Sequence, residues 1–94
     1  MYRIFRTKSF IKSLSRIERS GKLSDDFLSN LKRLVVILQT KRRVSKKFKD
    51  HNLHGKYKGY RECHIKGDLL LIYKINDDKL ILLLSDIGSH SSLF

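Results

Sequence analysis

The stretch YRECHIKGDLLLIYKINDDKLILLLS, residues 60–85, decides the fold of this chain of 94 residues. Residues 60–65 alternate between two faces, which is the side-chain pattern of a half-buried strand. Residues 69–75 are nearly all apolar, as in a central strand, and residues 80–85 form a third apolar run. Turn-forming residues separate these runs at 66–68 and 76–78. The stretch therefore predicts a three-stranded antiparallel meander.

Upstream of the meander, the sequence predicts one short strand and two amphipathic helices. The strand spans residues 2–5, and Thr7 can cap a helix whose apolar residues recur at helical spacing as far as Ile17. Ser24 can cap a second helix with a wide apolar stripe up to Leu38. We expect a single α+β domain over residues 1–94, in the order strand, two helices and meander. Both helices should pack on one face of the sheet and leave the other face open.

The chain is strongly basic, with 21 Lys and Arg against 9 Asp and Glu, which gives a formal net charge of +12. This bias favours a polyanionic partner: RNA, DNA, an acidic protein or an anionic membrane. The apolar runs are too short to span a bilayer, and the first residues lack the apolar core of a signal peptide. The one cysteine, Cys63, excludes an internal disulfide and fits the cytoplasm, where we expect the protein to act.

Residues 44–59 lack periodicity and are basic, polar and punctuated by glycine, so they are predicted to form a long surface loop. Loops of this length inside a small domain are usually functional. The loop and the strand that follows it supply candidate contacts for RNA phosphates, namely Lys46, Lys47, Lys49, Lys56, Lys58 and Arg61.

Histidines are concentrated in the second half of the chain, at positions 51, 54, 64 and 90. Histidine is the side chain best suited to move protons near neutral pH. Strand alternation places His64 on the same face as Glu62 and opposite Cys63. If the helices cover the Cys63 face, His64 lies on the open face, either in a site or as an ordinary surface histidine.

Metal-free cleavage of RNA needs a base for the 2′-hydroxyl proton, an acid for the leaving 5′-oxygen, and cations around the transition state. The candidates for proton transfer are His51, His64, Asp68 and His90, and Phe94 could stack on a base. A metal site is the competing interpretation, because His51, His54, Cys63 and His64 offer nitrogen and sulfur ligands. Their spacing matches no common zinc motif.

Three segments together resemble the YafQ branch of the RelE/ParE superfamily, which comprises toxins of bacterial type II toxin–antitoxin modules. They are KDHNLHGKYKGYRECH at residues 49–64, DLLLIYK at 68–74 and GSHSSLF at 88–94. The resemblance covers the whole chain and is specific from Lys49 onward. It implies a RelE-like fold and a ribosome-dependent endoribonuclease that cuts mRNA through the message's own 2′-hydroxyl, without metal or other cofactor. It also implies three partners: a cognate antitoxin, the ribosome and mRNA.

The resemblance also implies roles for individual residues. His90 is the first choice for the general acid, Asp68 or His51 for the base, and His64 for stabilising the transition state. Glu62 and Phe94 would be supporting or orienting residues. Leu69 stands where the family often has tryptophan, and His54 falls where the pattern does not require histidine.

Two other functions fit the same composition. A ParE-like toxin inhibits DNA gyrase by protein binding and needs none of the histidines. A non-catalytic RNA-binding module would use the basic surface alone. All three predict salt-sensitive binding, so only cleavage of translated mRNA separates them.

Overall fold

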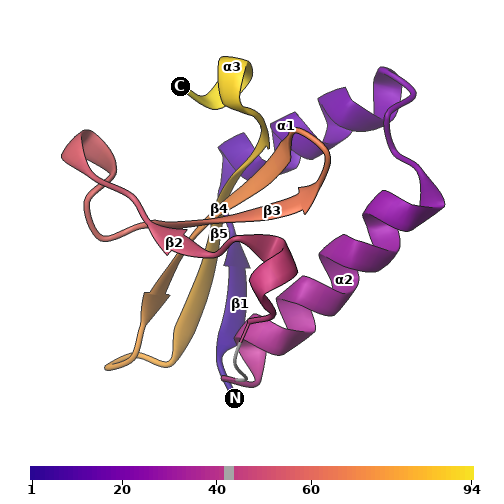
Figure 1. The fold of residues 1–94 in the computed structure, drawn as a ribbon. Coiled ribbons are helices and arrows are strands. Elements are labelled where there is room, and N and C mark those ends of the chain that lie inside the picture. Colours follow the sequence, from indigo (N-terminus) through magenta and orange to yellow (C-terminus); the bar gives the residue numbers. More distant parts are fainter. Residues whose placement is uncertain (42–43) are drawn as a thin grey trace.

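A five-stranded sheet with two helices packed against it forms the body of the protein (Figure 1). The computed structural model describes residues 1–41 and 44–94. The strands lie in the order β1-β5-β4-β3-β2, with β1 parallel to β5 and the other pairs antiparallel. The elements are β1 (Arg3–Arg6), α1 (Lys8–Arg19), α2 (Asp25–Gln39), η1 (Lys46–Phe48), β2 (His51–Asn52), η2 (Gly55–Tyr57), β3 (Arg61–Lys66), β4 (Leu69–Asn76), β5 (Ile81–Ser89) and α3 (His90–Leu93).

The predicted order of strand, two helices and meander is confirmed, as are the two helix caps. The Thr7 hydroxyl accepts the backbone N–H of Phe10, and the Ser24 hydroxyl accepts that of Phe27. The apolar faces of α1 and α2 meet one face of the sheet in a core that includes Leu34, Leu71, Tyr73, Leu82 and Cys63. No helix within the described ranges is long and apolar enough to cross a membrane.

The structure differs from the prediction in the segment before the meander and in the bounds of the last strand. The segment predicted to be one long loop contains η1, β2 and η2, and its Phe48 is buried in the core. The last strand begins at Ile81, because Leu80 adopts the left-handed backbone conformation with φ of 54°. It also continues to Ser89, beyond the predicted run of residues 80–85, and Gly88 pairs with Leu70 of β4.

The face of the sheet opposite the helices is partly covered, whereas the sequence predicted it to be open. Leu70 and Ile72 point away from the helix-side core and are still 0% and 1% exposed. At this end of the sheet α3 folds back over Gly88, and the Tyr57 hydroxyl of η2 donates to the Leu93 carbonyl oxygen of α3. Glycine permits the close approach, because a Cβ at position 88 would lie 2.6 Å from Ser92 Oγ.

Gly88→Ala is therefore expected to push α3 off the sheet and to lower the free energy of unfolding by about 1–3 kcal/mol. Urea denaturation followed by circular dichroism measures the change. The double variant Gly88→Ala/Ser92→Ala removes the closest atom. Its loss in free energy of unfolding should be smaller than the sum of the losses in the two single variants. Strict additivity would show that α3 does not rest on Gly88.

Candidate active site

The carboxylate of Glu62 is buried on the partly covered face of the sheet and lies at the centre of the candidate site. Its side chain is 2% exposed, although strand alternation placed it on a face expected to be open. Oε1 has no hydrogen-bond donor among the described residues. Three imidazoles approach this oxygen through Nε2: His51 at 3.7 Å, and His64 and His90 at 3.5 Å each. Three histidines far apart in sequence thus share one carboxylate oxygen.

His51 reaches Glu62 from the neighbouring strand, since the two residues are paired in the register of β2 and β3. Its Nδ1 lies 2.7 Å from the Lys49 carbonyl oxygen. A carbonyl oxygen only accepts, so Nδ1 carries the hydrogen. In the neutral ring Nε2 then has a free lone pair facing the centre of the site, which is the state a general base requires.

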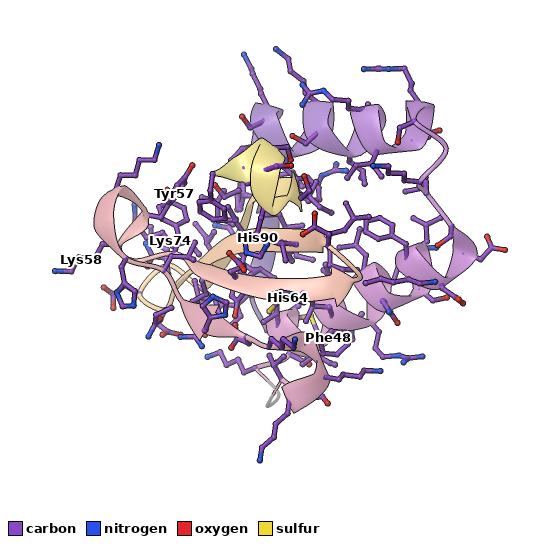
Figure 2. The ribbon with its side chains drawn as sticks, turned by 45° about the horizontal axis from the view of Figure 1, so that its top comes forward. Phe48, Tyr57, Lys58, His64, Lys74 and His90 are labelled. Atoms are coloured by element: carbon purple, nitrogen blue, oxygen red, sulfur yellow. The ribbon has the colours of Figure 1, made fainter. Side chains whose placement is uncertain are left out.

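His90 lies between two carboxylates at the start of α3. Its Nε2 faces Glu62 and its Nδ1 lies 3.5 Å from Asp68 Oδ1. Each nitrogen therefore has an acceptor nearby, an arrangement that suits the doubly protonated ring of a general acid. In Figure 2, His90 on α3 and His64 on β3 lie close together, and their ring centroids are 5.8 Å apart.

His64 is the least exposed of the three imidazoles, at 24% against 51% for His51 and 54% for His90. Burial lowers the pKa of His64 below its ordinary value, although the Glu62 carboxylate acts in the opposite direction. The charges of Lys49, His90 and His51 add to the lowering. At neutral pH His64 is therefore a neutral ring that can donate or accept one proton.

Aromatic side chains border the cluster on the α3 side. The Phe94 ring centroid lies 5.9 Å from that of His90 and 5.3 Å from that of Tyr57. Phe94 is 54% exposed, so its face can meet a ligand. Tyr57, which contacts both Phe94 and α3, was not among the site residues predicted from the sequence (Figure 2).

The remaining residues predicted for a metal site or for phosphate contact lie outside the histidine cluster. Cys63 is fully buried on the helix side and His54 is exposed at the start of η2, so neither belongs to the ligand cluster of Glu62, His64 and His90. The five lysines predicted to contact phosphate (Lys46, Lys47, Lys49, Lys56 and Lys58) are exposed. Arg61 is instead occupied within the protein, because its Nη2 donates to Asp50 Oδ2 at 2.8 Å.

Comparison with known proteins gives the class of this protein. The family described as bacterial toxin of type II toxin–antitoxin system, YafQ, matches residues 2–94. The putative toxin YafQ of Haemophilus influenzae is 36% identical over 89 residues, covering 90% of this chain and 84% of that protein. The mRNA interferase toxin YafQ of Escherichia coli B is 34% identical over 88 residues, covering 83% and 94%.

Solved structures agree with the sequence relatives. A metal-bound toxin from Helicobacter pylori is 41% identical with a TM-score of 0.88, and each chain is covered completely. YafQ in the E. coli DinJ–YafQ complex is 29% identical with a TM-score of 0.83, covering 100% of this chain and 99% of that one. Fold and sequence together define a toxin of a type II toxin–antitoxin system. Within that class, the chain belongs to the YafQ family.

The electrostatics of the site lead to a prediction for His64. Replacing Glu62 with glutamine removes the charge that raises the pKa of His64 and leaves the burial that lowers it, so the pKa should fall further. NMR titration of the histidine Cε1 protons measures the shift. Asp68→Asn is the matched control, since Asp68 faces His90 and should leave the pKa of His64 nearly unchanged. A rise in the pKa of His64 in the Glu62→Gln variant would contradict the placement of His64 beside the Glu62 carboxylate.

Proposed function

We propose that the protein is a ribosome-dependent endoribonuclease that cleaves mRNA by attack of the 2′-hydroxyl, without metal. The observation that carries this proposal is the convergence of His51, His64 and His90 on one buried carboxylate oxygen. Nucleases that use the 2′-hydroxyl need a proton acceptor and a proton donor within reach of one phosphate. The names of the E. coli relatives, mRNA interferase toxin YafQ, support cleavage of mRNA as the activity.

In the proposed mechanism, His51 Nε2 takes the proton of the 2′-hydroxyl and His90 returns a proton to the leaving 5′-oxygen. Geometry favours His51 over Asp68 as the base, because Asp68 faces His90 and its side chain is 68% exposed. Glu62 stabilises each imidazolium in turn, since its unpaired oxygen accepts a charged N–H. His64, as a neutral donor, hydrogen-bonds a non-bridging oxygen of the phosphorane-like transition state.

Charge and stacking would come from outside the histidine cluster. The exposed lysines of η1, η2 and the adjacent loops provide cations for ribosomal RNA and message phosphates. Phe94 stacks on a splayed base next to His90. An activity that depends on translating ribosomes would place the protein in the cytoplasm.

A cognate antitoxin is the proposed regulatory partner. The E. coli relative forms a complex with DinJ. A net charge of +12 favours an acidic segment on the antitoxin, and covering the histidine face would block access to the message.

Primer extension on mRNA translated in vitro tests the activity. The wild-type protein should produce cuts that require ribosomes. His90→Ala and His64→Ala should reduce the cleavage rate by about 10²–10⁴-fold, because each removes a group that acts in the transition state. His54→Ala is the matched control, since it removes an exposed histidine outside the cluster and should cleave at the wild-type rate.

Two outcomes would contradict the proposal. Intact mRNA with folded wild-type protein would exclude the nuclease, and accompanying DNA breaks linked to gyrase would support the ParE-like alternative. Ribosome binding without cleavage would support the non-catalytic RNA-binding alternative.

Metal binding is a second candidate function, favoured by the donor set of Glu62, His64 and His90. Their ligand atoms all lie within 4.8 Å of one another, and the carboxylate oxygen is buried without a donor. Two imidazoles and a carboxylate fit zinc or copper, and the H. pylori relative is a metal-bound toxin. Such a metal would supply Lewis acidity, but it would occupy the lone pairs that proton transfer uses.

We expect cleavage to survive a chelator selective for zinc and copper, applied with magnesium retained for the ribosome. Added Zn²⁺ should inhibit, and the chelator should restore the rate. His64→Ala should weaken Zn²⁺ binding in calorimetry, whereas His54→Ala should not. Loss of cleavage with the chelator and its recovery with Zn²⁺ would overturn the metal-free mechanism.

A further inference from the structure

We propose that Asp50 and Arg61 are positioning residues that hold His51 in the orientation and tautomer a general base needs. This inference rests on the proposed nuclease function and adds two residues to it. Neither residue touches the cluster at Glu62, and both belong to the 49–64 segment. Asp50 has no role so far, and Arg61 was predicted to contact phosphate.

His51 lies in an element too short to position it alone. β2 contains only His51 and Asn52, and the His51 side chain is 51% exposed. A two-residue strand at the edge of a sheet contributes little ordering of its own. Something outside the strand must therefore fix the imidazole opposite Glu62.

Arg61 binds the residues on both sides of His51. Its Nε and Nη2 donate to the two carboxylate oxygens of Asp50 at 3.2 and 2.8 Å. Its Nη1 donates to Asn52 Oδ1 at 2.5 Å. A guanidinium is a planar fork that fixes direction as well as distance. The three guanidinium nitrogens thus hold the side chains of the residues immediately before and after the histidine.

Side-chain alternation completes the arrangement. Asp50 and Asn52 turn toward Arg61, so His51 between them projects to the opposite side, where Glu62 lies. Lys49 adopts a left-handed backbone conformation with φ of 50°, and its carbonyl oxygen receives His51 Nδ1–H. The turn at Lys49 and the clamp at Asp50 together leave Nε2 unprotonated and directed into the site.

Asp50 is held by more than one donor, as expected of an anchor. The Tyr73 hydroxyl donates to Oδ1 at 2.5 Å, and the Cys63 thiol lies 3.4 Å from the same oxygen. Burial alone would raise the pKa of Asp50, but the hydrogen bonds from Arg61, Tyr73 and Cys63 lower it overall. The carboxylate therefore remains charged throughout the pH range in which a histidine base titrates.

The test uses Asp50→Asn, which keeps the shape and loses the charge. We expect the single-turnover cleavage rate to fall by about 10–100-fold with affinity for the ribosome within about twofold, because misplacing a reacting group costs rate rather than binding. The ¹⁵N shifts of His51 should change from the single Nδ1–H tautomer to a mixture. Asn52→Ala, at an exposed position, should show the same effects more weakly.

A double-mutant cycle separates positioning from a general structural role. In a His51→Ala background, Asp50→Asn should cause no further loss, since its effect passes through the missing imidazole. Asp26→Asn is the matched control, because it disrupts the exposed Asp26–Lys66 pair and should leave rate and tautomer unchanged.

Three results would overturn the inference: an unchanged tautomer in Asp50→Asn, additive losses in the cycle, or full activity in His51→Ala. Failure of the proposed function is distinguishable from these. If the wild-type protein cut no mRNA at all, the nuclease would be excluded, while the ¹⁵N measurement would still decide whether Asp50 fixes the His51 tautomer.

Discussion

The buried Glu62 carboxylate is the constraint on which the rest of the structure depends. A carboxylate out of water with an unpaired oxygen is costly, and the cost is offset only when charged or polar N–H groups face it. Here the available groups are three imidazoles, none of which is a close hydrogen-bond partner at 3.5–3.7 Å. The site is therefore under-satisfied at rest and gains most when an imidazole becomes protonated. Because the Glu62 oxygen is better satisfied by an imidazolium than by a neutral imidazole, the site supports the proposed proton transfer over a purely structural role.

Two covering segments create this burial. Without α3 and η2, the face that carries Glu62, Leu70 and Ile72 would be open to water. The contact of Tyr57 with Leu93 joins the two segments, and Gly88 lets α3 lie close to the sheet. The segment α3, which supplies His90, thus also helps to exclude water from Glu62. When α3 packs on the sheet, it buries the Glu62 carboxylate and brings His90 to it.

Much of this fold could be predicted from local patterns. Alternation gave the face of His64, and polar residues before apolar periodicity gave the caps at Thr7 and Ser24. The burial of Glu62 could not be predicted, because it depends on a tail that contacts the sheet only after folding. Gly88 illustrates the difficulty: glycine after an apolar run is typical of a strand end, yet here it marks a close approach within a continuing strand.

Arg61 shows a second limit of sequence reasoning. A cation in a basic segment has the same local signature whether it meets a phosphate or a carboxylate eleven residues away, as Asp50 is. Distance along the chain hides the pairing, and the net charge of +12 makes nucleic-acid contact the simpler interpretation. The sequence assigned Arg61 to phosphate and gave Asp50 no role, so their pairing became visible only in the folded protein.

The positions of the charges assign different roles to the acidic histidine cluster and to the basic surface around it. Glu62 and Asp68 make the cluster acidic, which helps imidazolium ions and opposes the approach of a phosphate. In the proposed function, cations near the site are therefore needed for RNA binding. The charge of Lys49 is close enough to lower the pKa of His64. Lys49 also supplies the carbonyl that orients His51. One residue of the loop thus links the basic surface proposed to attract RNA to the acidic cluster proposed to cut it.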